Sequence, residues 1–107
     1  MATVTLADVQ AQVFSSRCAL SGCHTGTGAP QGLALSSGAS AANIINVPSA
    51  EDPALLRVEP GDAANSYLFM KVTADPRIHG DPMPLNRTPL NAADLALIET
   101  WINQGAN

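Results

Sequence analysis

The sequence predicts an all-α fold, and two observations support this prediction. Segments with apolar residues at helical spacing follow residues suited to cap a helix, whereas no segment alternates apolar and polar residues as a strand does. The stretches between them are rich in turn-forming residues, since the chain contains 8 Gly and 8 Pro. Because its 107 residues show no internal repeat, we expect one domain, residues 1–107, of about four helices joined by long loops.

The first helix is expected to begin at Thr5 and to fade near Ser16. Thr5 suits the N-cap position, and Asp8, three residues later, resembles the acidic half of a capping box. The apolar face of this helix would consist of Leu6, Val9 and Val13, with Phe14 beside them. The helix would then lead directly into the segment that contains both cysteines.

A turn-rich loop is expected over residues 25–37, with Leu33 and Leu35 as its buried residues. A short helix over residues 39–45 follows it and would end at Asn46. The next loop, residues 49–60, would bury Leu55, Leu56 and Val58.

The two remaining helices are expected in the second half of the chain. One covers residues 63–72, with Asp62 as the preferred cap and Asn65 as the alternative. Four prolines then exclude regular structure over residues 73–89. The last helix would begin after Asn91 and stop at Gly105. Its apolar stripe would consist of Leu95, Ile98 and Ile102, widened by Leu97 and Trp101.

The two cysteines of the chain lie close together in the segment R-C-A-L-S-G-C-H-T, residues 17–25. Cys18 and Cys23 are spaced C-x4-C, and His24 follows directly. This arrangement is typical of covalent haem attachment, in which each sulfur adds to a haem vinyl group and the histidine binds iron; the usual motif is C-x-x-C-H. The longer spacing requires two extra residues to loop out, which Gly22 permits. The sequence therefore predicts one haem c held by two thioether bonds.

A second axial ligand is expected unless the site is catalytic, and the candidates are Met83, His79 and Met70. Met83 lies in the segment D-P-M-P-L, where prolines stiffen the backbone, so that little entropy is lost when its sulfur binds iron. His79 is the second choice, with an exposed loop histidine as the alternative interpretation. Met70 lies in an apolar helical run, which favours a position in the core.

These motifs resemble those of the small monohaem class I c-type cytochromes, bacterial type, with a lengthened C-x4-C-H attachment motif. The similarity rests on F-S-S-R-C-A-L-S-G-C-H, V-E-P-G-D-A-A-N-S-Y-L and D-P-M-P-L-N, and it runs from Phe14 to Trp101. It implies a cytochrome c-like fold, in which the first and last helices cross beside the haem and one haem edge is exposed. The site residues that it implies are Cys18 and Cys23 as thioether links, His24 as proximal ligand and Met83 as distal ligand.

Haem propionates require hydrogen-bond donors, and Arg57 is the best candidate in the sequence. An arginine on the solvated surface is the alternative interpretation. Trp101 could also donate through its indole N–H, but a tryptophan on an apolar helix face is expected first in the core.

The charge balance limits the partners. Five basic residues against nine acidic ones give a formal net charge of −4, which disfavours nucleic acid and anionic membranes and favours a redox partner with a basic docking patch. No stretch is long enough to span a membrane, and we expect a monomer. The first residues do not resemble a secretion signal. Because haem c is attached outside the cytoplasm, we expect a periplasmic or otherwise extracytoplasmic protein whose leader has been removed.

The leading functional hypothesis is a soluble electron carrier that uses no catalytic side chain and is not an enzyme. One alternative is a haem enzyme or gas sensor with an open distal position. Another is a secreted binding domain without haem, in which Cys18 and Cys23 form a disulfide. A structural zinc site is a further alternative, and it would need His79 as a fourth ligand.

Overall fold

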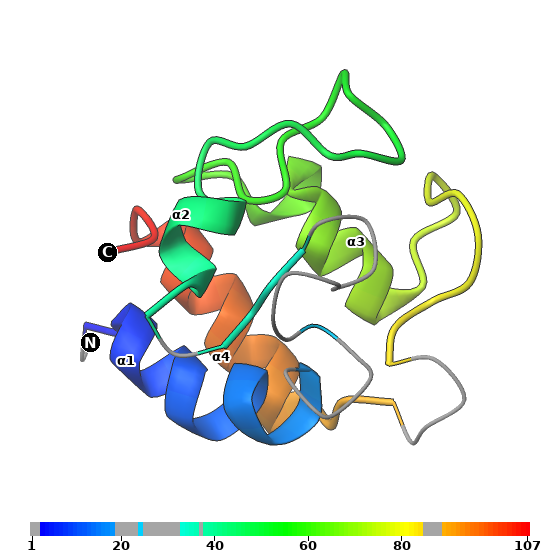
Figure 1. Cartoon of the computed structure of the whole chain (residues 1–107). Helices are drawn as coiled ribbons and strands as arrows, with labels where there is room; N and C mark the ends of the chain where they lie inside the picture. Colours follow the sequence, from blue (N-terminus) through cyan, green and yellow to red (C-terminus); the bar gives the residue numbers. More distant parts are fainter. Residues whose placement is uncertain (1–2, 19–23, 25–32, 37, 85–88) are drawn as a thin grey trace.

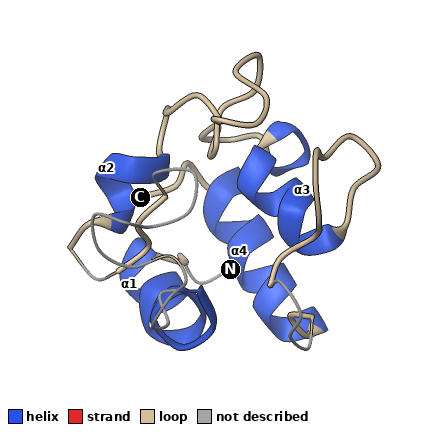
Figure 2. Cartoon of the chain, turned by 45° about the vertical axis from the view of Figure 1, so that its right-hand side comes forward, coloured by secondary structure: helices blue, strands red, loops and turns tan. Residues whose placement is uncertain are grey.

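The computed structural model describes residues 3–18, 24, 33–36, 38–84 and 89–107. Within these residues the chain forms helices and loops and no strand, as Figure 2 shows. Two isolated bridges, between Ile45 and Val58 and between Pro48 and Leu56, are the only strand-like pairings in this part of the chain. The molecule measures 36 × 27 × 26 Å. The predicted all-α class with about four helices is therefore confirmed.

The first helix begins with α1, Leu6–Val9, and continues into η1, a π-helical stretch over Gln10–Cys18 (Figure 1). The predicted capping box is present: the amide of Asp8 donates to Thr5 Oγ1 at 3.4 Å, and the amide of Thr5 donates to Asp8 Oδ2 at 3.0 Å. The helix does not fade near Ser16 but reaches Cys18. The helix thus carries the first cysteine itself.

The short helix α2, Ser40–Ile44, lies within the predicted range. It ends before Asn46, which adopts a left-handed backbone with φ of 59°. Gln10 joins this helix to the rest of the molecule, because its side chain donates to the Leu35 carbonyl at 2.9 Å and accepts from Ser40 Oγ at 2.6 Å.

The single helix predicted over residues 63–72 is in fact two elements, the 3-10 turn η3, Ala63–Asn65, and the helix α3, Tyr67–Thr73. Asp62 caps the turn as predicted, since its side chain accepts from the amide of Asn65 at 3.3 Å.

The break at Ser66 has a physical cause in the preceding loop. The amide of Tyr67 donates to the Leu56 carbonyl, and the amide of Leu68 donates to the Arg57 carbonyl, both at 2.9 Å. These bonds replace the ones that the two amides would make in a continuous helix. They also attach the start of α3 to the loop before it. Val58 of this loop is fully buried, as predicted, whereas Leu55 and Leu56 are half-buried.

The last helix, α4, covers Ala92–Asn103 and agrees with the prediction at both ends. Asn91 Oδ1 accepts from the amide of Asp94 at 2.8 Å. Gly105 follows the helix with φ of 111°, a conformation that favours glycine.

The core lies where α4 packs against the first helix (Figure 1). The rings of Phe14 and Trp101 meet edge to face, with centroids 6.3 Å apart and planes at 83°. The indole N–H of Trp101 donates to the Asn107 carbonyl at 3.0 Å, so the core role expected for this residue is confirmed. No helix in the described part of the chain is both long and apolar enough to cross a membrane.

Candidate functional site

An open cavity lies among η1, α3, α4 and the loops that follow His24 and α3. Its empty volume is about 850 Å³, a figure that includes the open mouth on the solvent side. Most of its wall is apolar. The apolar side chains that line it include Phe14, Leu33, Leu35, Leu68, Val72 and Ile98.

Three residues predicted as haem ligands or attachment points line this cavity, namely Cys18, His24 and Met83. Cys18 arrives there as the last residue of η1 and is half-buried. The backbone of His24 lies next to this helix end, because its amide donates to the Cys18 carbonyl at 3.0 Å. The helix end therefore fixes the position of the histidine as well as that of the cysteine.

The loop after His24 determines how its ring is oriented. The His24 carbonyl accepts from the amide of Leu35 at 2.8 Å, and the ring Nδ1 lies 2.8 Å from the Leu33 carbonyl oxygen. A carbonyl only accepts, so Nδ1 carries the hydrogen and donates it. In a neutral ring Nε2 then keeps its lone pair, which is the form that binds a metal.

The surroundings of His24 favour this neutral form. Burial lowers the pKa of the His24 imidazole from its ordinary value, and the hydrogen bond to Leu33 offsets part of that effect. The positive charges of Arg57 and Lys71 lower the pKa further. At neutral pH the ring is therefore uncharged.

Met83 reaches the cavity from the loop after α3, which is drawn in yellow in Figure 1. Its side chain is half-buried, and its amide donates to the Lys71 carbonyl at 2.9 Å. Two neighbouring prolines and a bond to helix α3 thus restrict the backbone that carries this thioether.

The two competing ligand candidates are placed differently. Met70 is 1% exposed, so the predicted core role is confirmed, and it is not among the described residues that line the cavity. The side chain of His79 is 63% exposed, with Nε2 3.7 Å from Asp52 Oδ2. His79 is likewise not among the described lining residues, so the structure does not bring it together with Cys18 and His24 as the zinc hypothesis requires.

Polar side chains occupy one part of the cavity wall. Arg57, the predicted propionate donor, lines the cavity, and its Nη1 donates to the Asn43 carbonyl at 2.8 Å. Burial lowers the pKa of this guanidinium, which nevertheless stays protonated at neutral pH. The wall also includes Glu51, Tyr67 and Lys71.

These last three residues form a hydrogen-bonded group that the sequence does not predict as part of the site. Lys71 Nζ lies 3.0 Å from Glu51 Oε1, and the Tyr67 hydroxyl donates to the same carboxylate oxygen at 3.1 Å. Burial, and then the Glu51 carboxylate, raise the pKa of the Tyr67 phenol, so it remains a neutral donor. A sequence signal does exist, because Lys71, the single lysine of the chain, lies four residues after Tyr67 in an apolar run and so shares its helix face.

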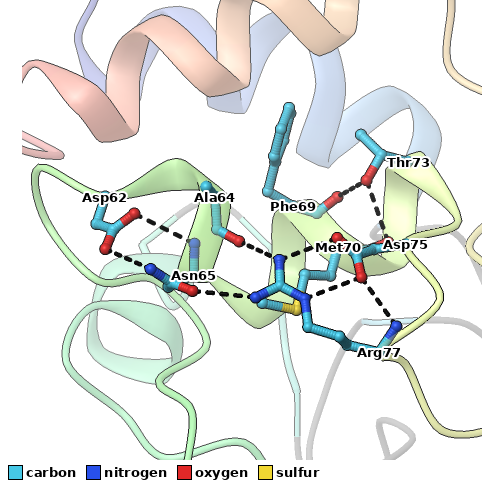
Figure 3. A network of polar contacts seen from close by, with 8 residues as sticks. All are labelled: Asp62, Ala64, Asn65, Phe69, Met70, Thr73, Asp75 and Arg77. Atoms are coloured by element: carbon cyan, nitrogen blue, oxygen red, sulfur yellow. Dashed lines mark hydrogen bonds and ion pairs between the residues drawn. The ribbon is translucent and has the colours of Figure 1, made fainter.

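A second polar network holds the beginning of the loop that leads to Met83 (Figure 3). Arg77 Nη2 donates to the Ala64 carbonyl at 2.7 Å, and Nη1 donates to Asn65 Oδ1 at 3.0 Å. The same guanidinium binds Asp75 and holds the pKa of that carboxyl below its ordinary value. This network lies on the surface and ties the loop to η3.

Several predicted features lie outside the described residues. They are Cys23, the four residues 19–22 between the two cysteines, and most of the loop 25–37. Among the residues that are described, no three His, Cys, Asp or Glu side chains are close enough together to hold a metal ion. The donor set at the cavity is therefore an imidazole, a thioether and a thiol.

This donor set fits a haem. Imidazole and thioether are common axial ligands of haem iron, a thiol can add to a vinyl group, and the apolar wall suits a porphyrin face. No protein-family model, curated protein or solved structure matches this chain. The chemistry of the cavity is therefore what indicates a function for this chain.

Proposed function

We propose that this chain is an electron carrier with one c-type haem and a cytochrome c-like fold. The observation that carries the proposal is that Cys18, His24 and Met83 line one apolar cavity, where the His24 Nδ1 hydrogen is bound to a backbone carbonyl. His24 would be the proximal ligand and Met83 the distal one. Cys18 and Cys23 would hold the haem through thioether bonds.

When bound, the haem supplies a one-electron couple between ferrous and ferric iron. The chain holds the groups around it in fixed positions. His24 is oriented by Leu33, and the Met83 backbone is held by Lys71, so both side chains need little rearrangement. The apolar wall excludes water and thereby limits solvent reorganisation. Arg57 offers a positive charge at the cavity for a propionate.

Electron transfer without a catalytic side chain fits an extracytoplasmic carrier that passes electrons between protein partners. With a formal net charge of −4, the carrier would be the acidic member of such a pair. A partner with a basic patch is therefore the expected docking partner.

The visible absorption spectrum, recorded before and after addition of dithionite, tests this proposal. After expression with the periplasmic haem-attachment machinery, we expect a low-spin c-type spectrum with sharp bands on reduction and no change when carbon monoxide is added. A reduced protein that binds carbon monoxide readily would instead indicate an open distal site, as in a haem enzyme or gas sensor. A protein without haem bands would refute the proposal and leave a disulfide-bonded binding domain as the alternative.

A further inference from the structure

We propose that Lys71 is a positioning residue for Met83, and that it acts by holding the peptide group of His79 in place. This inference rests on the proposed function, because it assigns Met83 as an axial ligand. It gives His79 a role through its backbone, which differs from the ligand role considered for its imidazole.

Two side chains of α3 bind the backbone of His79, one at its carbonyl and one at its amide. Lys71 Nζ donates to the His79 carbonyl at 2.9 Å, and the amide of His79 donates to the Tyr67 hydroxyl at 2.8 Å. Four residues later, the amide of Met83 donates to the Lys71 carbonyl at 2.9 Å. The segment between His79 and Met83 is therefore attached to one helix at both of its ends.

Glu51, in the loop between α2 and η3, binds both of these α3 side chains. Its Oε1 atom lies 3.0 Å from Lys71 Nζ and accepts from the Tyr67 hydroxyl at 3.1 Å. The side chain of Lys71 is only 10% exposed and that of Glu51 is 23% exposed. A charge withdrawn from water requires a partner, and Glu51 is the partner of the Lys71 ammonium group. This ion pair holds the ammonium group within hydrogen-bond distance of the His79 carbonyl.

These contacts explain why a buried lysine occupies the cavity wall. An apolar residue at position 71 could also cover the cavity, and its backbone carbonyl could still accept from Met83. Such a residue could not bind the His79 carbonyl, and the His79 end of the segment 79–83 would then be attached to α3 only by the bond from its amide to the Tyr67 hydroxyl. Another ligand, such as added imidazole, would consequently displace the Met83 side chain more readily from its position in the cavity.

Two variants and one matched control test this role in the haem-loaded protein. Lys71→Leu removes the ammonium group and introduces no sulfur. The double variant Glu51→Gln/Lys71→Leu avoids an unpaired carboxylate and serves if the single variant does not fold. Arg77→Leu is the control, because it removes the same charge from the start of the same loop and breaks the bonds to Ala64 and Asn65, but leaves those at His79.

The first measurement is the affinity for added imidazole, which must displace Met83 to bind. We expect imidazole to bind about tenfold more tightly to the Lys71 variants than to the wild type, the effect of losing a hydrogen bond from a charged donor. The second measurement is the exchange rate of the Met83 amide hydrogen, which should rise in the same variants. Arg77→Leu should lower the thermal stability and change neither quantity.

Unchanged imidazole affinity and unchanged amide exchange in both Lys71 variants would overturn the positioning role while leaving the haem function intact. Equal effects in Arg77→Leu would also overturn it, because the cause would then be a general loosening of the loop. A wild-type protein without haem would refute the proposed function itself, and with it any role of Lys71 towards a ligand.

Discussion

The rings of Phe14 and Trp101 pack edge to face, with their centroids 6.3 Å apart. This contact joins the first helix to the last one, and Phe14 also lines the cavity. It therefore supports both the core and the candidate haem site.

Phe14→Ala should be among the most destabilising substitutions in this protein. Phe14 is 1% exposed, so truncating it leaves a cavity between two helices, and we expect a loss of about 3–5 kcal/mol in the free energy of unfolding. Denaturant unfolding measures this loss. Glu99→Ala, on the exposed side of α4, is the control and should change stability by less than about 0.5 kcal/mol. Similar effects of the two substitutions would contradict the assigned core.

The cap of α4 gives a second prediction. Because Asn91 Oδ1 accepts from the amide of Asp94, Asn91→Ala should cost about 1 kcal/mol of stability, whereas Asn91→Asp keeps an acceptor and should cost little. Thermal unfolding of the two variants checks this difference. If both lowered the stability equally, the side-chain bond would not be the cause.

The placement of the methionines predicts opposite outcomes for two alanine variants. Met83→Ala should abolish the weak band at the red end of the oxidised spectrum, which is expected for sulfur bound to ferric low-spin haem, and should lower the reduction potential. Met70→Ala should keep the band and cost about 2–5 kcal/mol of stability, because Met70 is buried in the core. The oxidised absorption spectra and the reduction potentials of the two variants show which methionine is the distal ligand. The reverse pattern would transfer the distal role to Met70.

Docking to a basic partner should depend on ionic strength. The formal net charge of −4 favours such a partner, and attraction between exposed charges is screened over about 8–10 Å at moderate salt. The rate of electron transfer to a basic redox protein, measured by stopped-flow spectroscopy, should therefore fall as salt is added. A small uncharged electron donor serves as the control and should show no such decline. A rate with the protein partner that is indifferent to salt would count against electrostatic docking.

Features encoded by neighbouring residues were predictable from the sequence. The capping box at Thr5, the cap at Asn91 and the left-handed Gly105 all act within a few residues, and each marks a helix end that the structure confirms. The break at Ser66 was not predictable, because it depends on bonds from the start of α3 to the loop that includes Leu56. That pairing exists only after the chain has folded.

The same distinction applies to the candidate site. The motif around His24 and the prolines beside Met83 identify these residues from local sequence, and the structure places both at one cavity. The contact of Lys71 with Glu51 joins segments that are distant in the sequence, and its contact with the His79 carbonyl depends on the path of the loop after α3. A lone lysine in an apolar run indicates a buried charge but does not reveal its partners.

The mass of the denatured protein shows whether a haem is covalently bound. Protein expressed with the periplasmic haem-attachment machinery should have the mass of the polypeptide plus one haem, because the proposed thioether bonds at Cys18 and Cys23 would survive unfolding. Replacing both cysteines by alanine should return the mass to that of the polypeptide alone. A wild-type mass without added haem under these conditions would contradict the account.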